Sequence, residues 1–153
     1  WNGMSQLDEL YREVILDHYR NPRRRGSLSG EHLHADGTNP SCGDEFSVDI
    51  RIEDGIVTDA AMKGQGCSIS QASGSMMMEA IVGMSVDDIQ DLTQKFKVMM
   101  TIEEGEDPLD PDRPGSALGD LEALQGVRKF PVRIKCAGLA WTTLEDALDQ
   151  STV

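Results

Sequence analysis

Near the start of the chain, largely apolar residues recur at intervals of three and four, which is the spacing of one helical face. The pattern predicts a helix from Leu7 to Tyr19, with Ser5 as its N-cap. We expect it to end at Asn21-Pro22, because the residue before a proline disfavours helical backbone. The expected inner face consists of Leu7, Leu10, Tyr11, Val14, Ile15 and His18.

A strict alternation of apolar and polar residues from Phe46 to Glu53 is typical of a half-buried strand. Asp54-Gly55 is a tight-turn signal, so we expect Ile56 to Lys63 to return as the antiparallel partner. His32 to Thr38 is a weaker candidate for a further strand. These segments predict a small antiparallel sheet of about three strands.

Helical patterns dominate the second half of the chain. We expect a buried helix from Ser68 to Met84 and a further helix, capped by Ser85, that reaches Met100. The three-methionine run within the first of these helices is interpreted as core filler, not as a set of sulfur ligands.

After an acidic, proline-rich stretch (residues 103–114) that we expect to be an exposed loop, three leucines indicate a short helix. Pro131 can open the last helix, because the first helical position needs no N–H donor. The order of elements predicts an α+β fold in which the small antiparallel sheet packs against several helices. The leucines of the short helix are Leu118, Leu121 and Leu124.

A chain of 153 residues without an internal linker fits one domain, which we place at residues 4–153. Trp1-Asn2-Gly3 resembles a cloning remnant ahead of a natural start at Met4. No apolar run approaches the roughly 20 residues that span a bilayer, so no membrane association is expected. The net charge of −13 argues against nucleic acid, whose phosphates would repel the chain.

The chain has three cysteines, an odd number that cannot pair completely in disulfides and that favours a reducing, cytoplasmic setting. Cys42 precedes the first strand of the expected hairpin and Cys67 follows the second, so both lie at the same end of the hairpin. Asp44 is two residues from Cys42, and in extended backbone both side chains point the same way. Cys136 lies in the last expected helix.

Cys42, Asp44, Cys67 and Cys136 would supply the four ligands of a tetrahedral zinc ion. Three thiolates and a carboxylate leave two negative charges uncancelled by a dication, and Arg133 and Lys135 could offset them. Such a set lacks the C-x-x-C pair of structural zinc fingers, and spacing alone leaves open that the three thiols are small, buried and unrelated.

The three histidines add little to this group. His18 lies on the inner face of the first helix and is expected to pack there, and His32 and His34 are expected to be solvated. The sequence contains no evident Ser/His/Asp arrangement, phosphate loop or dinucleotide fingerprint.

Three motifs in order carry all three cysteines, and they resemble the NifU-like or IscU-like family of iron–sulfur cluster assembly proteins. Residues 10–23 fit the first helix of the same family, so the resemblance covers nearly the whole chain. The motifs are Asn39-Pro40-Ser41-Cys42-Gly43-Asp44, Gly64-Gln65-Gly66-Cys67-Ser68-Ile69-Ser70-Gln71-Ala72-Ser73 and Arg133-Ile134-Lys135-Cys136-Ala137.

Within this family the chain is more similar to the SufU branch than to the IscU scaffolds. Scaffold-type members have a histidine directly before the third cysteine, where this chain has Lys135, and a Leu-Pro-Pro-Val-Lys segment, where it reads Phe130-Pro131-Val132-Arg133. The acidic segment after Met100 resembles an insertion of the SufU branch. The resemblance implies a SufE/NifU-like fold and zinc on Cys42, Asp44, Cys67 and Cys136.

The resemblance also implies a partner, a SufS-type pyridoxal-phosphate cysteine desulfurase that passes persulfide sulfur to this chain. We expect Cys42, on a glycine-flanked loop, to accept the sulfur once a partner ligand has replaced it at the zinc, and downstream scaffold or acceptor proteins to receive it. One alternative is a scaffold that holds iron or a nascent [2Fe-2S] cluster on the same ligands. Another is a structural zinc domain that serves as an acidic interaction surface.

Overall fold

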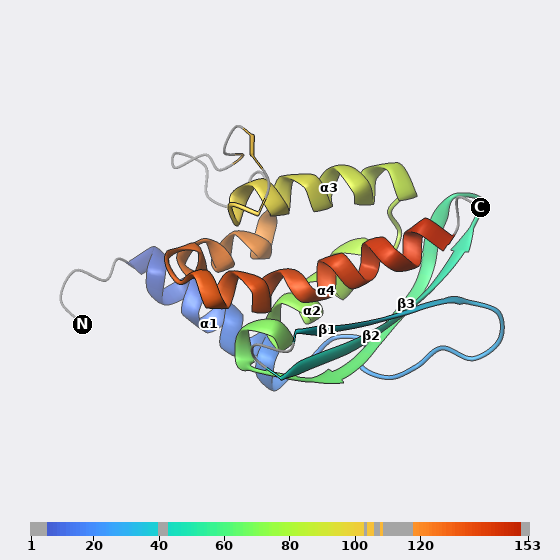
Figure 1. Ribbon diagram of the computed structural model, residues 1–153, viewed down its shortest axis with the longest axis horizontal. Coiled ribbons are helices and arrows are strands. Elements are labelled where there is room, and N and C mark those ends of the chain that lie inside the picture. The colour runs from blue at the N-terminus through green and yellow to red at the C-terminus, as the bar shows by residue number, and fades with distance from the viewer. Residues whose placement is uncertain (1–5, 40–42, 103, 106–107, 109–117, 151–153) are drawn as a thin grey trace.

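The computed structural model describes residues 6–39, 43–102, 104–105, 108 and 118–150, and it has helices packed on one three-stranded sheet (Figure 1). Helix α4 lies along β1 and β2, and α2 lies beside α4 and β3. The expected α+β class with a small antiparallel sheet is confirmed. The elements in chain order are α1 (Gln6–Arg20), β1 (Leu33–Asn39), β2 (Asp44–Glu53), β3 (Ile56–Gln65), α2 (Ser68–Ile81), α3 (Val86–Met99), the 3-10 helix η1 (Gly119–Lys129) and α4 (Pro131–Asp149).

The three strands are antiparallel in the order β1-β2-β3. Val48 and Ile50 of β2 point toward the helices and are fully buried, which accounts for the alternation seen in the sequence. The β2–β3 turn contains Asp54 and Gly55, both with positive φ, as a tight hairpin turn requires. β1, the weakest of the three expected strands, is confirmed and pairs along its whole length with β2.

The segment that joins α1 to β1 first runs along the outer edge of β3 and then passes onto the face of the sheet that is turned away from the helices. Its backbone pairs with β3, since Gly26 N–H donates to the Met62 carbonyl (2.7 Å) and Met62 N–H donates to the Arg24 carbonyl (3.0 Å). The Leu28 N–H then donates to the Asp49 carboxylate (3.1 Å), which this segment buries. Loop backbone therefore covers a sheet face that the alternation predicted to be solvated.

Two histidines at this face make contacts that the sequence analysis did not anticipate. His34 Nδ1 lies 2.5 Å from Asp49 Oδ1, and its Nε2 lies 3.0 Å from Asp36 Oδ1. His32 Nε2 lies 3.6 Å from the other Asp49 oxygen. The side chain of His34 keeps the expected exposure to solvent (45%) and that of His32 is partly exposed (23%), but both also contact a buried carboxylate.

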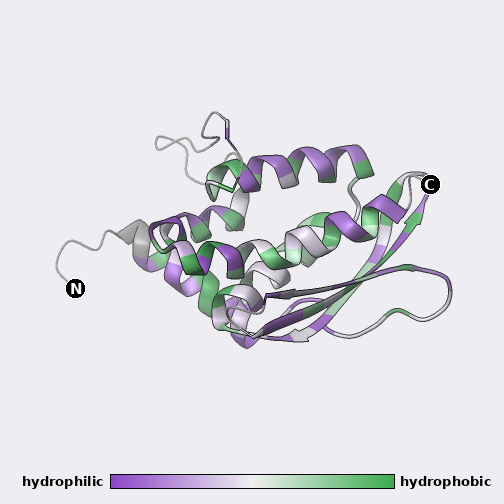
Figure 2. Ribbon diagram, viewed as in Figure 1, coloured by the Kyte–Doolittle hydropathy of each residue, from purple (hydrophilic) through white to green (hydrophobic). Residues whose placement is uncertain are grey.

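The core lies between the sheet and the helices. Phe96 of α3 stacks on Trp141 of α4, with ring centroids 4.6 Å apart and an interplanar angle of 20°. Met76, Met77 and Met78 are buried in α2, as expected for core filler. In Figure 2 hydrophilic residues predominate along α3, in keeping with its place at the outside of the helical layer.

The helices begin and end close to where the sequence places them. α2 stops at Ile81, three residues earlier than expected, because Val82 is extended and Gly83 has a φ of 94°. Ser85 caps α3 as predicted, with its hydroxyl accepting from the Asp88 N–H (3.1 Å). The expected exposed loop at 103–114 falls largely outside the described residues.

His18 is buried in α1, and its Nδ1 lies 2.8 Å from the Ser75 hydroxyl, which fits the expected packing role. Among the residues that the structure describes, no helix combines the length and the apolar character needed to cross a bilayer.

Candidate metal centre

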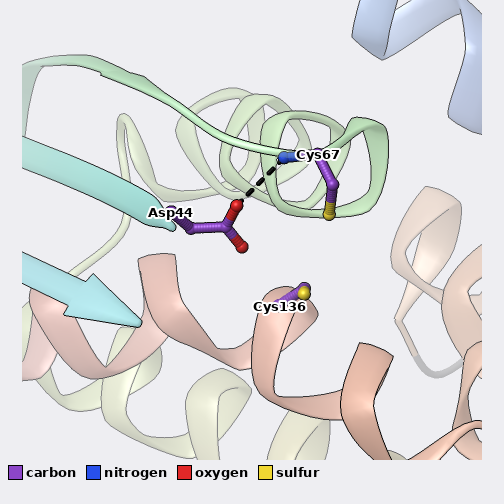
Figure 3. A group of neighbouring side chains, drawn as sticks. All are labelled: Asp44, Cys67 and Cys136. Atoms are coloured by element: carbon purple, nitrogen blue, oxygen red, sulfur yellow. Dashed lines mark hydrogen bonds between the residues drawn. The ribbon is translucent and has the colours of Figure 1, made fainter. Parts of the chain in front are cut away.

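The candidate centre lies where β2 begins, β3 ends and α4 passes close to the start of α2 (Figure 3). Asp44 is the first residue of β2, and the pairing of Glu45 with Gln65 brings it to the end of β3. Cys67 follows directly as the N-cap of α2. The hairpin therefore returns the chain to one point, as the sequence predicted.

The two oxygens of the Asp44 carboxylate have different environments. Oδ1 accepts a hydrogen bond from the Cys67 backbone N–H at 3.0 Å. Oδ2 is buried and finds no hydrogen-bond partner among the residues that the structure describes. An unpartnered buried oxygen on a carboxylate is costly unless a cation or a donor reaches it, so this atom fits the demands of a bound metal ion.

Cys136 brings the third ligand from the second turn of α4. Its side chain is fully buried, and its thiol can donate to the Val132 carbonyl at 3.7 Å. One ligand atom from each of Asp44, Cys67 and Cys136 lies within 4.8 Å of the others. Donor atoms bound to one metal at 2.0–2.3 Å lie roughly 3–4 Å apart, so a small inward movement would close this group on a cation. Two thiolates and a carboxylate form a donor set that suits zinc.

The environment of Cys67 favours its ionised form. Burial on its own would raise the pKa of the Cys67 thiol, but hydrogen bonds from the Ser70 backbone and hydroxyl, with smaller contributions from Cys136 and the Ile69 backbone, lower that pKa below its ordinary value. Ser70 Oγ lies 3.7 Å from Cys67 Sγ. Cys67 is therefore prepared as a thiolate ligand at the N-terminus of α2.

Arg133 lies beside both thiols. Its pKa is raised by a hydrogen bond to the Cys67 thiolate, by the charge of that thiolate and, less strongly, by Cys136. The guanidinium therefore places a positive charge beside the two thiols. Lys135 is exposed on the same turn of α4.

Of the four expected ligands, the structure brings Asp44, Cys67 and Cys136 together, and Cys42 lies outside the described residues. The sequence analysis missed two residues that shape the centre. Ser70 is three positions after Cys67 in a helix, a spacing that places side chains side by side and could have revealed it. Gly66 packs so closely that a Cβ there would lie 2.5 Å from both Asp44 Oδ1 and Ser70 Oγ.

The chain is similar to known proteins along most of its length. The model of the NifU-like N terminal domain family matches residues 10–147. The chain is 47% identical to the zinc-dependent sulfurtransferase SufU of Bacillus subtilis, over 92% of this chain and 90% of that protein. It is 38% identical to the iron–sulfur cluster assembly scaffold protein IscU of Streptococcus pyogenes, over 97% of this chain and 89% of that protein.

A solved structure has a similar fold. The crystal structure of FiSufU from Fervidobacterium islandicum AW-1 superposes with a TM-score of 0.78 at 31% identity, over 89% of this chain and 94% of that one. A family match over most of the chain, with two relatives above 35% identity along nearly their full lengths, leads to one conclusion. The chain belongs to the NifU-like N-terminal domain family, and within it is similar to SufU.

Proposed function

We propose that this chain is a zinc-dependent sulfur acceptor that takes persulfide sulfur from a SufS-type cysteine desulfurase for iron–sulfur cluster assembly. The observation that carries the proposal is the convergence of Asp44, Cys67 and Cys136, together with the buried Asp44 Oδ2, which has no partner within the described part of the chain. The printed name of the Bacillus relative, a zinc-dependent sulfurtransferase, supports the same reading.

In this proposal Asp44, Cys67 and Cys136 hold the zinc ion with Cys42 as the fourth ligand. A bound zinc ion keeps its thiol ligands deprotonated at neutral pH. A carboxylate is a harder donor than a thiolate, so among thiolate ligands it binds zinc less tightly. Asp44 therefore makes one zinc position easier to exchange than it would be in an all-cysteine site. Such a set suits an exchange of ligands better than a purely structural one.

Sulfur transfer requires a thiolate of this chain to attack the outer sulfur of the donor's persulfide. A new sulfur–sulfur bond forms on the acceptor, the sulfur–sulfur bond of the donor breaks, and the donor cysteine leaves as a thiolate. No external oxidant or reductant is consumed, because the persulfide is exchanged from one cysteine to another. The transferred sulfur is now the outer atom of a persulfide anion on the acceptor cysteine. From there it can be passed to the next acceptor protein by the same kind of exchange.

Cys42 is proposed as the acceptor. Cys136 is fully buried within α4, and Cys67 is fixed at the start of α2 by its hydrogen bonds to Asp44 and Ser70. Both are suited to hold the metal. Cys42 belongs to the short connection between Asn39, the last residue of β1, and the start of β2. It directly precedes Gly43, whose φ of 70° marks a bend just before β2.

The test is a sulfur-transfer assay with a cysteine desulfurase and the variants Cys42→Ala and Asp44→Ala, each with its zinc content measured. We expect Cys42→Ala to lose acceptance of persulfide sulfur even in preparations that retain zinc. We expect Asp44→Ala to lose part of its zinc. Transfer to Cys42→Ala at the wild-type rate would show that another residue is the acceptor.

A second candidate is a scaffold that holds iron or a [2Fe-2S] cluster on the same ligands and passes it to acceptor proteins. The relation to the Streptococcus IscU scaffold supports it, and Lys135 in place of a histidine before Cys136 speaks against it. Anaerobic reconstitution with iron and sulfide separates the two. A stable cluster at full occupancy, with its visible absorption, would favour the scaffold over the sulfur acceptor.

A further inference from the structure

The start of α4 exposes two large apolar side chains beside the candidate metal centre. Phe130 is 61% exposed and Val132 is 62% exposed, more than any other large hydrophobic residue in the described part of the chain. They are separated only by Pro131 and lie four to six residues before Cys136. Single exposed apolar residues are ordinary, but a pair at the edge of a site is typical of a contact surface.

Phe130 also occupies a position where another residue would serve the fold better. It is the N-cap of α4, with the extended backbone of an N-cap (φ −122°, ψ 93°), and its side chain makes no capping hydrogen bond. Serine, threonine, asparagine or aspartate there would satisfy a free N–H of the first turn. The fold gains no cap from Phe130 and leaves most of its ring in water.

The charge around Phe130 is unfavourable to the helix as well. Residues 128–135 hold four of the chain's 14 lysines and arginines and none of its 27 aspartates and glutamates. The first turn of α4 has no acidic residue, although the positive end of a helix dipole favours acids and disfavours cations. Lys129, Arg133 and Lys135 are all exposed there, in a chain with a net charge of −13.

We infer that Lys129, Phe130, Val132, Arg133 and Lys135, here called the basic–apolar rim, dock an acidic surface of the sulfur donor with an apolar pocket for Phe130. The inference rests on the proposed function, since a donor persulfide must come within bonding distance of the centre that the rim borders. Two departures from what stabilises a helix, an uncapped exposed aromatic residue and a cationic first turn, coincide at this border.

The occupant is an acidic surface because the rim is the exposed cationic stretch next to the centre. Complementary charge steers association and makes it sensitive to salt, while a seated aromatic residue supplies the largest share of affinity in many interfaces. Val132 and Lys135 are three residues apart on α4, so a single partner surface can contact both.

The experiment uses two rim variants, Phe130→Ser and Lys129→Glu, and two matched controls, Ile56→Ser and Lys95→Glu. Ile56 is a partly exposed apolar residue at the first position of β3, roughly 30 Å along the strand from the centre at 3.3 Å per residue. Lys95 is half-exposed on α3 and forms an i,i+4 surface ion pair with Asp91. For each variant, the affinity for a SufS-type cysteine desulfurase is measured at low and at high salt. The zinc content and the thermal unfolding midpoint of the same preparation are measured as well.

We expect Phe130→Ser to weaken binding about tenfold or more, as loss of an interface hot spot does, and to leave the thermal midpoint unchanged or higher because serine caps α4. Lys129→Glu should weaken binding and reduce its salt dependence. Both controls should bind within about twofold of the wild type. This combination of unchanged stability and lost affinity would not arise from a purely structural role.

Binding by the combined Phe130→Ser and Lys129→Glu variant within twofold of the wild type would overturn the inference and leave the proposed function standing. A wild-type chain that neither binds the desulfurase nor accepts its sulfur would overturn the proposed function, and the inference with it. Dimerisation of the chain alone that Phe130→Ser abolishes would assign the rim to a second copy and also overturn the inference.

Discussion

At the residue scale, the centre depends on how closely Gly66 lets the chain pass Asp44. The backbone of Gly66 is not in the left-handed region, so its role is steric and not conformational. A Cβ would meet Asp44 Oδ1 and Ser70 Oγ, both at 2.5 Å, inside any normal contact distance. The glycine keeps the carboxylate where it can both accept from the Cys67 N–H and offer its second oxygen to a cation.

The substitution Gly66→Ala should therefore displace the Asp44 carboxylate and lower zinc affinity about 10–100-fold, the usual effect of disturbing residues that orient a ligand. Competition with a chromophoric chelator measures it. The control is Gly126→Ala in η1, where an added Cβ meets nothing within 4 Å and φ is not positive. Equal zinc affinity in both variants would contradict the steric role of Gly66.

A second prediction at this scale concerns His34. Its pKa is raised by the hydrogen bond to Asp49, against the opposing effect of burial, and further by Asp36. A raised folded-state pKa means that the stability from His34 is fully present below the unfolded pKa of about 6.5, and is lost as pH rises through the higher folded value. His32 lies 3.6 Å from the Asp49 carboxylate that His34 also contacts.

We expect the wild type to be more thermostable than His34→Gln at pH 6, and this difference to shrink by pH 9. Because the His34 side chain is 45% exposed, solvent screens the pair, and the difference should be small, roughly 1–2 °C. Thermal unfolding across this pH range measures it. A difference that grows with pH would contradict the assigned direction of the pKa shift.

At the element scale, α2 and α4 carry Cys67 and Cys136 and are joined through one serine. The Ser73 hydroxyl donates to the Ala137 carbonyl at 2.6 Å and accepts from Trp141 Nε1 at 3.1 Å. Ser73 is fully buried, so removal of its hydroxyl leaves the indole N–H without a partner.

Ser73→Ala should lower the free energy of unfolding by about 1–3 kcal/mol, the usual cost of orphaning a buried donor. Urea denaturation measures it. Thr142→Ala is the matched control, because the Thr142 hydroxyl is exposed and donates only within its own helix, to Leu139 O at 3.0 Å. Equal stability of the two variants would show that the Ser73 contact contributes nothing.

At this scale the sequence predicts features that depend on residues close together in the chain, and not those that depend on contacts between distant segments. The hairpin of β2 and β3 was predictable because its alternation and its Asp54-Gly55 turn are local signals. The pairing of Arg24 and Gly26 with Met62 was not, since a basic loop has no alternation that reveals its partner. α2 ends at Ile81 because the backbone of Gly83 has a positive φ, and the spacing of apolar residues gives no information about that dihedral angle.

The site was predictable to a similar extent. Asp44, Cys67 and Cys136 could be proposed as neighbours because a hairpin returns its two ends to one place and the chain has only one other thiol, that of Cys42. Ser70 and Gly66 were missed because neither is a ligand, and their importance is a matter of distances that only the fold supplies. The attachment of His34 and His32 to Asp49 was missed for the same reason.

At the scale of the whole molecule, the fold joins three distant parts of the chain at one point. β2, the start of α2 and the start of α4 each contribute one residue of the candidate metal group, so we expect metal binding to require the folded chain. The same arrangement concentrates cations at the edge of the centre in a chain whose net charge is −13. Membership of the NifU-like N-terminal domain family agrees with this architecture.

The most direct test of the central claim is the zinc content, by elemental analysis, of protein purified without added metal, for the wild type and for Asp44→Ala, Cys67→Ser and Cys136→Ser. The account predicts close to one zinc ion per wild-type chain, and a clear loss in each variant, because all three residues bind the same ion. A folded wild type that contains no zinc and takes up none on titration, or variants that keep it in full, would contradict the account.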